Sequence, residues 1–348
     1  MLKKAMAALL AMSLMTALAA GCSGADTSTN ASTGTNTSTS TSTGGETQGE
    51  TIMLSYGSVL PADHQFSTSA ARIQEKLMER TEGALGIEYF AGGQLGSEKD
   101  NVDSVVNGSL DLALASPGEL GKRYAPLLMF DAPYVFENAE QCIEVLNGEP
   151  GQKLYEEFTA QTGLIALGNL LLGTRQLATA KIPVTVPADL EGQKIRVPDT
   201  PTAVGYMEAM GGKPTPMAIT EVYLALQQGV VDGCENPISQ ILSNKFNEVT
   251  KYMSLTRHVV QTDQIIMNQE RYESLSDDLQ QVLADTIKEE CDICVQEVLD
   301  YEEEIEAKLP EYGYEVIEAD LDAFRTKVVE EFKSNEVWDQ EVYDLFNS

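Results

Sequence analysis

Residues 276–309 read SDDLQQVLADTIKEECDICVQEVLDYEEEIEAKL and carry the most informative helical pattern in the sequence. Apolar residues recur there at helical spacing on one stripe, and Pro310 ends the pattern. The stripe consists of Leu279, Val282, Leu283, Ile287, Cys291, Cys294, Val298 and Ile305. Such a helix would be about 50 Å long, against about 30 Å for the width of a small domain. We therefore expect a helix over about 276–309 that spans two lobes. A coiled coil is the alternative, which the globular pattern around the helix disfavours.

The chain before this helix alternates strand patterns with amphipathic helix patterns, as α/β sheets do. A first unit opens with a strand at 51–56 and a helix at 66–80. After Arg175 the alternation restarts with a strand at 194–197. The chain beyond position 50 has about 300 residues, more than one hydrophobic core comfortably supports. These patterns predict an α/β protein with two lobes.

The first 21 residues resemble an export signal, because Lys3 and Lys4 precede an apolar run that is too short to span a bilayer. Small residues stand directly before Cys22, as at a bacterial lipoprotein processing site, so we predict lipidation of Cys22. Simple secretion after cleavage near Ala20 is the alternative. Residues 22–49 are mostly Ser, Thr, Gly and Asn, which predicts a disordered tether. The sequence thus indicates an extracytoplasmic protein held at the cell membrane by a lipid.

The charge and the cysteines exclude several classes of protein. The chain has 54 acidic and 23 basic side chains and a net charge of −31, which argues against nonspecific binding to nucleic acid or anionic lipid. Cys291 and Cys294 form a C-x-x-C inside the long helical pattern. A redox motif needs a helix N-terminus, and a zinc site needs further ligands. We interpret both cysteines as packed thiols.

No motif for catalysis is apparent. His64 and His258 are the only histidines, and the sequence lacks metalloprotease, nucleophile-elbow and Walker motifs. We therefore predict no catalytic residue, no metal and no cofactor. A secreted enzyme that acts on acidic saccharides stays open as an alternative, because the many carboxylates could supply an acid and a base.

Two arginines stand out in a chain with few cations. Arg175 follows a strand pattern, and Arg196 lies in the strand pattern at 194–197. A guanidinium offers a fixed fork of donors that matches a carboxylate. A structural ion pair is the competing interpretation of either arginine. The sequence pattern alone leaves the two interpretations open.

Several phrases in order resemble one known family. The longest runs from 189 to 237 and contains LEGQKIRVP at 190–198, EVYLALQ at 221–227 and GVVDGCENP at 229–237. Gln94 to Glu98, Gly108 to Asp111 and Lys245 to Val249 agree as well, so the resemblance extends from Thr51 to the C-terminus. Together the phrases resemble the DctP-type solute receptors of TRAP transporters.

This resemblance implies a periplasmic-binding-protein-like fold, in which two α/β lobes enclose a cleft and a long helix bridges them. We place lobe I at 51–173 plus 262–301 and lobe II at 174–261 plus 302–348. By position, Arg196 is similar to the family arginine that pairs with the ligand carboxylate. Arg175 is similar to a second arginine in that contact, and Asn236 to the amide that completes the clamp. The implied partners are a small organic acid and a membrane permease, and we expect a monomer.

The sialic-acid receptors of the family also line their pocket with residues at the positions of Glu98, Ser116, Asp199 and Ile219. Those receptors have Glu, Asn and Phe where this chain has Ser116, Asp199 and Ile219, so we do not predict sialic acid. A sugar acid such as a hexuronate is favoured over a C4-dicarboxylate, because Glu98 could accept a hydroxyl. A sensor that presents the closed lobes to a membrane receptor stays a further alternative.

Overall fold

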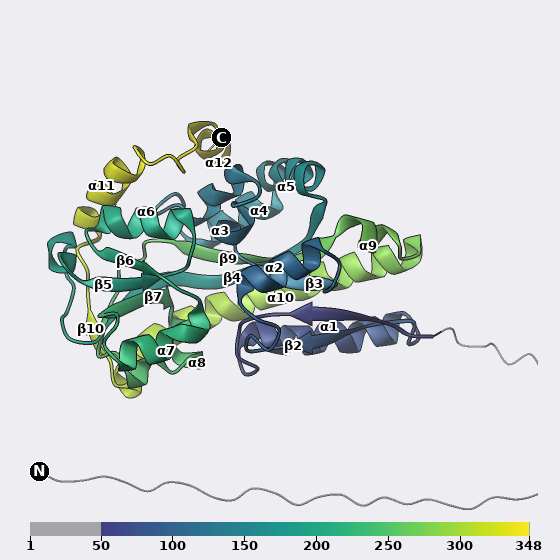
Figure 1. Ribbon diagram of the computed structural model, residues 1–348, viewed down its shortest axis with the longest axis horizontal. Coiled ribbons are helices and arrows are strands. Elements are labelled where there is room, and N and C mark those ends of the chain that lie inside the picture. Colours follow the sequence, from purple (N-terminus) through teal and green to yellow (C-terminus); the bar gives the residue numbers. More distant parts are fainter. Residues whose placement is uncertain (1–49, 348) are drawn as a thin grey trace, which may run out of the picture. The chain divides into compact units, whose positions relative to one another are not determined.

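The computed structural model describes residues 50–347, and Cys22, the expected signal and the expected tether lie outside this range. The described strands form one mixed sheet in the order β2-β1-β3-β9-β4-β7-β5-β6, and β8 pairs with β4 and with β10 (Figure 1). The strands are β1 (Ile52–Gly57), β2 (Leu85–Phe90), β3 (Leu112–Ala115), β4 (Leu164–Thr179), β5 (Lys194–Val197), β6 (Lys213–Pro216), β7 (Gly233–Pro237), β8 (Tyr252–Ser254), β9 (Val260–Asn268) and β10 (Glu315–Ile317).

Helices connect these strands and pack against the sheet. They are α1 (Gln65–Arg80), α2 (Glu98–Val106), α3 (Pro117–Leu120), α4 (Ala139–Asn147), α5 (Glu149–Thr162), α6 (Pro201–Met210), α7 (Ile219–Gln227), α8 (Ile238–Ser243), α9 (Gln269–Glu273), α10 (Asp277–Lys308), α11 (Leu321–Phe332) and α12 (Gln340–Phe346), with short 3-10 turns η1 (Ala125–Asp131), η2 (Pro187–Leu190), η3 (Phe246–Glu248) and η4 (Leu309–Tyr312).

The sheet has a first half, formed by β2, β1, β3 and β9, and a second half, formed by β7, β5, β6, β8 and β10. Strand β4 belongs to both halves. Its residues 164–174 pair with β9, and its residues 175–179 pair with β7 and β8. The sequence predicted a strand that ends before Arg175, and this is wrong, since the strand continues through that residue. Gly173, the residue at which the first segment of the expected lobe I ends, has φ 117°, and the pairing register shifts between Leu171 and Gly173 without ending the strand. The two halves of the sheet are therefore joined by an unbroken strand.

Helix α10 is the predicted long helix, with bounds of Asp277–Lys308. Ser276 caps its N-terminus by accepting a hydrogen bond from the Leu279 backbone amide. Six residues of the predicted stripe are buried, namely Leu283, Ile287, Cys291, Cys294, Val298 and Ile305. The helix lies along β4, on both sides of the point where the strand passes from the first half of the sheet to the second (Figure 1).

Two glycines of β4 permit this close approach. A Cβ on Gly168 would lie 2.5 Å from the Cys291 sulfur, and one on Gly173 would lie 2.3 Å from Oε1 of Glu302. Glu302 accepts hydrogen bonds from the Thr174 amide at 2.6 Å and from its hydroxyl at 3.2 Å. These hydrogen bonds thus connect the junction of the two sheet halves to α10.

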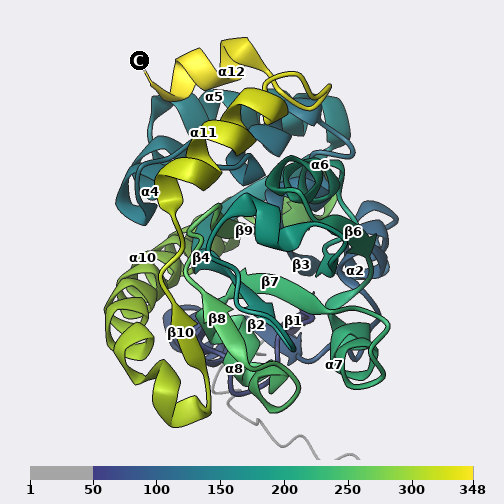
Figure 2. The same cartoon turned by 90° about the vertical axis from the view of Figure 1, so that its left-hand side faces the viewer.

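The C-terminal helices contact both halves. Helix α11 lies beside α6 (Figure 2). Helix α12 returns to the first half, where the ring of Phe346 lies 4.5 Å from Phe130 and 5.4 Å from Phe136 between centroids. The last residues of the described chain therefore link the β5–β7 half to the β1–β3 half.

The described cysteines are buried and form no disulfide within residues 50–347; they are Cys142, Cys234, Cys291 and Cys294. Burial raises the pKa of the Cys291 thiol well above its ordinary value. The interpretation of Cys291 and Cys294 as packed thiols is confirmed. Between residues 50 and 347, no helix combines the length and the apolar character that crossing a membrane requires.

Candidate functional site

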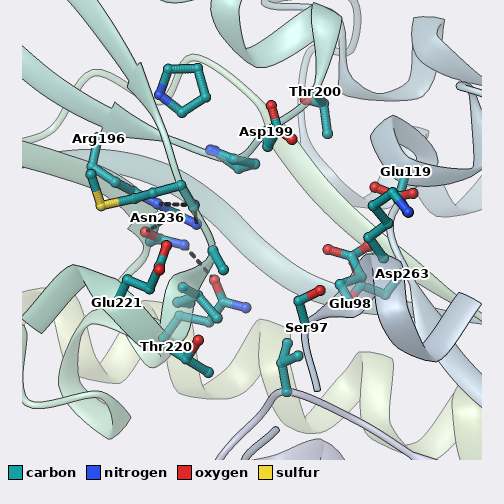
Figure 3. Close-up of a pocket in the computed structure, with 18 of the residues that line it drawn as sticks. Ser97, Glu98, Glu119, Arg196, Asp199, Thr200, Thr220, Glu221, Asn236 and Asp263 are labelled. Atoms are coloured by element: carbon teal, nitrogen blue, oxygen red, sulfur yellow. Dashed lines mark hydrogen bonds between the residues drawn. The ribbon is translucent and has the colours of Figure 1, made fainter. Parts of the chain in front are cut away.

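A cavity of about 360 Å³ lies between the two halves of the sheet. The first half contributes the start of α2, helix α3 and strand β9 to its wall. The second half contributes the segment after β5, residues 216–221, strand β7 and helix α8. Ligand pockets usually measure about 300–1,000 Å³, so this cavity suits a small molecule. Figure 3 shows side chains from both halves pointing into it.

Arg196 presents a buried cation to this cavity. It lies on β5, which is flanked by β6 and β7 in parallel, and only 3% of the residue is exposed. Its Nε and Nη2 atoms donate to the Met217 carbonyl at 3.1 and 2.8 Å, and Nη1 donates to Oδ1 of Asn236 at 3.4 Å. Among residues 50–347 no carboxylate forms a salt bridge with Arg196. Burial lowers the pKa of Arg196 to about 10.

Arg175 is equally buried, but its charge is neutralised within the protein. Its Nη2 donates to Oε1 of Glu235 at 2.7 Å and to the Glu235 carbonyl at 2.6 Å. Its Nε donates to Oε2 of Glu235, and its Nη1 to Oε1 of Gln261. The same Oε2 lies 3.1 Å from Nε2 of His258. Each nitrogen of this guanidinium thus already has an acceptor.

The pKa values reflect this pairing. Burial by itself would raise the pKa of Glu235, but the charge of Arg175 and hydrogen bonds from His258 and Arg175 lower it to about 2. Burial opposes the charged form of Arg175 too, and the charge of Glu235 more than offsets it, so that the pKa of Arg175 lies above its ordinary value. Both partners are therefore ionised at neutral pH.

Amide side chains stand beside Arg196. Asn236 lies on β7 and uses Nδ2 to donate to Oε1 of Gln240, at 2.6 Å. Both amides line the cavity. An anion on Arg196 would find the Asn236 amide next to it (Figure 3).

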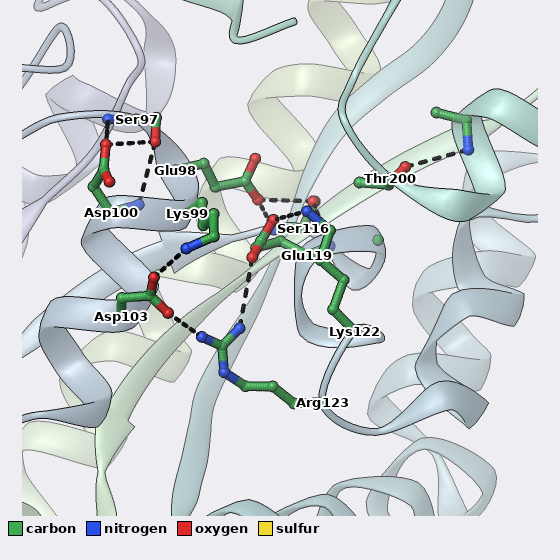
Figure 4. Close-up of polar contacts among 12 residues, drawn as sticks. Ser97, Glu98, Lys99, Asp100, Asp103, Ser116, Glu119, Lys122, Arg123 and Thr200 are labelled. Carbon is green, nitrogen blue, oxygen red and sulfur yellow. Dashed lines mark hydrogen bonds and ion pairs between the residues drawn. The ribbon is translucent and has the colours of Figure 1, made fainter. Parts of the chain in front are cut away.

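The opposite wall is acidic. Oε1 of Glu98 accepts from the Ser116 amide at 2.6 Å and from its hydroxyl at 2.7 Å (Figure 4). Asp263, on β9, is 7% exposed and accepts one long hydrogen bond of 3.5 Å from Gln261. Burial, with the charges of Glu98 and Asp131, raises the pKa of Asp263 well above its ordinary value. Burial also raises the pKa of Glu98, although the bonds from Ser116 oppose the shift.

The lysines at this rim already have anionic partners. Nζ of Lys122 lies 2.7 Å from Oε2 of Glu119, and Lys99 pairs with Asp103. Arg123 pairs with Asp103 and lies 3.5 Å from Glu119. Figure 4 shows these ion pairs as one network over α2 and α3. Within the described residues, the cation that the cavity offers without a carboxylate partner is that of Arg196.

The family comparison decides what kind of protein carries this site. Residues 56–338 match the model of the DctP family, described as bacterial extracellular solute-binding protein, family 7. The chain belongs to this family. The resemblance to DctP-type solute receptors, which the phrases at 189–237 indicated, is therefore confirmed. This solute-binding receptor has the two-lobed α/β fold of TRAP receptors.

Individual relatives agree with that membership. A solute-binding protein of Roseobacter denitrificans is 33% identical over 230 residues, which cover 66% of this chain and 70% of the relative. The C4-dicarboxylate-binding periplasmic protein DctP of Rhodobacter capsulatus is 32% identical, over 70% of this chain and 73% of its own. A TRAP solute-binding protein of a Sulfitobacter species, solved with bound β-D-galacturonate, superposes with a TM-score of 0.80 at 29% identity, over 85% of this chain and 98% of that one.

The receptor brings most of the predicted ligand residues to its cavity. Those that line it are Arg196, Arg175, Asn236, Glu98, Asp199 and Ile219. Ser116 does not line the main cavity, because it caps α3 behind Glu98, where it lines a small adjoining cavity of about 30 Å³. Whether the lining residues touch the ligand stays a prediction.

Sequence reasoning missed the buried polar groups of the receptor's first half, Asp263 and Gln261, and also Gln240 of α8. A signal for Asp263 exists in the sequence, since an acid interrupts the strand-like run at 259–268. A charged residue in a buried strand is unusual and often has a function. The amides carry no comparable signal, because single Gln residues are frequent on surfaces.

Proposed function

We propose that the receptor binds a small organic acid, with the ligand carboxylate on Arg196, and delivers it to a TRAP permease. The main observation behind this proposal is that the buried guanidinium of Arg196 faces a cavity and has no carboxylate partner among residues 50–347. An unpaired buried charge is costly, so a site that contains one favours an anionic ligand strongly. The bound solutes of relatives support the class, since galacturonate, L-galactonate and C4-dicarboxylates are acids.

The clamp proposed here uses one arginine directly and the other as a support. Arg196 binds the carboxylate, with Asn236 completing the contact. Arg175 is held by Glu235 and, through that pair, keeps β4 and β7 in place beside β5. Arg175 therefore shapes the cavity and contributes a positive field that Glu235 largely cancels.

Closure of two lobes would complete the binding. We propose lobe I at 51–173 plus 262–301 and lobe II at 174–261 plus 302–348, with a boundary in β4 next to the Thr174–Glu302 contact. The cavity receives residues from both sides of that boundary. Closure would remove water and strengthen the ion pair with the ligand in a lower dielectric.

The placement in the cell follows from the family and from the N-terminus. Receptors of this family are extracytoplasmic. We propose in addition that Cys22 is lipidated and that residues 22–49 tether a monomeric receptor close to its permease. Globomycin sensitivity of processing and metabolic labelling with a fatty acid would test the anchor, and a Cys22→Ala chain should be secreted free of lipid.

We propose a binding protein and not an enzyme, in line with relatives that are binding proteins. The enzyme alternative would use carboxyls such as Glu98 and Asp263 as acid and base. It predicts that an acidic saccharide is altered on incubation with the protein. The receptor role predicts that the bound acid is recovered unchanged. A sensor would use the same pocket, and only the identity of the membrane partner distinguishes a sensor from a transport receptor.

A thermal-shift screen of the mature receptor tests the function. The ligands are hexuronates, aldonates, C4-dicarboxylates, keto acids and sialic acid. A ligand that binds only the folded state raises the unfolding midpoint by mass action. We expect a shift with one class of acid, and no shift for Arg196→Ala.

Lys194→Ala is the matched control, because Lys194 is an exposed cation on the same strand. It should keep the shift of the wild type. The absence of a shift with every acid, or a shift that survives in Arg196→Ala, would overturn the proposed function.

A further inference from the structure

The cavity has opposite electrostatic character at its two ends. Arg196 and Asn236 lie buried at the end formed by the second half of the sheet, where the carboxylates of Asp199 and Glu221 are exposed. Glu98 and Asp263 lie at the end formed by the first half, as Figure 3 shows. A ligand that reaches across the cavity therefore meets a cation at one end and carboxyl groups at the other.

The carboxyl groups of the acidic end have no cation of the protein to pair with. Neither Glu98 nor Asp263 forms a salt bridge with any cation within residues 50–347. The lysines that line the cavity are paired elsewhere, Lys122 with Glu119 and Lys99 with Asp103. Asp263 is more than nine-tenths buried, and its single hydrogen bond is long, at 3.5 Å. The carboxyl group of Asp263 can therefore accept further hydrogen bonds.

Asp131 is a further buried carboxyl group close to this end of the cavity. Its Oδ2 accepts from the Gly118 amide at 2.8 Å, and it lines the small cavity next to Glu98. Burial raises the pKa of Asp131 to about 7, although the charge of Arg175 opposes the shift. A second ligand carboxylate placed at this end would be buried beside these carboxyl groups, without a cation of residues 50–347 to pair with.

We propose, on the basis of the proposed function, that Glu98 and Asp263 form a subsite for the hydroxyl-bearing end of a monocarboxylate and exclude a second carboxylate. The ligand would then be a polyhydroxy acid with one carboxyl group, of the aldonate or uronate kind. Hydroxyls donate to Glu98 and Asp263, while the carboxylate occupies Arg196. C4-dicarboxylates and aldarates are rejected, because their second carboxylate would lie against two acids.

Matched pairs of acids test the subsite directly. Galactonate and galactarate share one skeleton and differ in a terminal CH2OH or carboxylate, and so do erythronate and meso-tartrate. Succinate and malate represent the C4-dicarboxylates. Titration calorimetry at pH 7.5 gives the affinity of the wild-type mature receptor for each. A buried carboxylate without a cation partner is costly, so we expect each diacid to bind at least about 100-fold more weakly than its monoacid partner.

Variants then assign the discrimination to residues. Asp263→Asn and Glu98→Gln replace a carboxyl group by an amide of similar shape, which offers an N–H donor to a second carboxylate, and should narrow the ratio between monoacid and diacid at least about 10-fold. Glu208→Gln is the control, because Glu208 is an exposed acid on α6 that does not line the cavity. It should leave the ratio within about threefold, since exposed charges are screened.

The outcomes separate this inference from the proposed function. A diacid that binds as tightly as its partner, or binding of succinate or malate alone, overturns the subsite and leaves the acid receptor intact. An unchanged ratio in both Asp263→Asn and Glu98→Gln, with unliganded unfolding midpoints like that of the wild type, also overturns it. If no acid of any class binds, both proposals fail.

Discussion

The two buried arginines, Arg175 and Arg196, differ in the partner that each one has. Both are 3% exposed, and both lie on strands beside β7. Arg175 is bound by both oxygens of Glu235, whereas Arg196 donates to a carbonyl and an amide. An arginine at a cavity wall thus does not by itself indicate a ligand site. The absence of a carboxylate for Arg196 among residues 50–347 is what distinguishes it.

The largest expected effect is that of Arg196→Ala on ligand binding. The substitution would leave the ligand carboxylate in the cavity without its cation, which should cost about 3–5 kcal/mol of binding free energy. Arg196→Lys should restore little, because an ammonium cannot present the fork. Titration calorimetry with the acid found in the screen measures both variants.

The unfolding of the unliganded protein provides the control for that substitution. Arg196→Ala removes a buried charge that has no ionic partner, so the free energy of unfolding without ligand should not fall by the amount that binding loses. A large loss of stability in the absence of ligand would mean that Arg196 has a structural role like that of Arg175.

The converse result is expected for Arg175→Gln. This change leaves Glu235 buried without its main cation, which should cost about 3 kcal/mol of unfolding free energy in the absence of ligand. Urea unfolding followed by circular dichroism measures it. If Arg175→Gln proved as stable as the wild type and yet failed to bind ligand, the assignment of the two arginines would have to be exchanged.

The pH dependence of stability should reveal the same pair. The pKa of Glu235 is lowered to about 2 in the folded protein, from an ordinary value of 4.5. Its contribution is therefore present above pH 4.5 and is lost as the pH falls toward 2, with a size of about 3 kcal/mol. The difference in unfolding free energy between wild type and Glu235→Gln should shrink over this range. A constant difference would contradict the lowered pKa.

A smaller effect is expected for Asn236→Ala. Asn236 accepts from Arg196 and donates to Gln240, and it is 2% exposed. The loss of one polar contact to the ligand should weaken binding by about 1–2 kcal/mol, or roughly 5–30-fold. Calorimetry against the same acid measures this. An effect equal to that of Arg196→Ala would show that the amide, and not the guanidinium, dominates recognition.

Much of the fold could be predicted from local sequence. The stripe at 276–309 predicted α10, since helical periodicity and a terminal proline are local signals. The phrases at 189–237 indicated the family and placed Arg196 and Asn236 at one cavity. These features depend on residues that are close in the chain or on an ordered set of motifs.

The partners of the site residues were harder to predict, because they depend on long-range pairing. Glu235 reaches Arg175 only because β4 and β7 are neighbours in the sheet, since the two residues are 60 positions apart in the sequence. Asp263 of β9 and Glu98 of α2 line the same cavity, although they are far apart in the sequence. Ser116 lies behind Glu98 because it caps α3. None of these contacts follows from periodicity or spacing.

The most direct test is a crystal structure of the receptor with the acid that the screen identifies. The account predicts that the ligand carboxylate lies within hydrogen-bond distance of the Arg196 guanidinium, while Glu235 still holds Arg175. A carboxylate on Arg175 with Glu235 displaced, or a ligand that leaves Arg196 without an anionic partner, would contradict it.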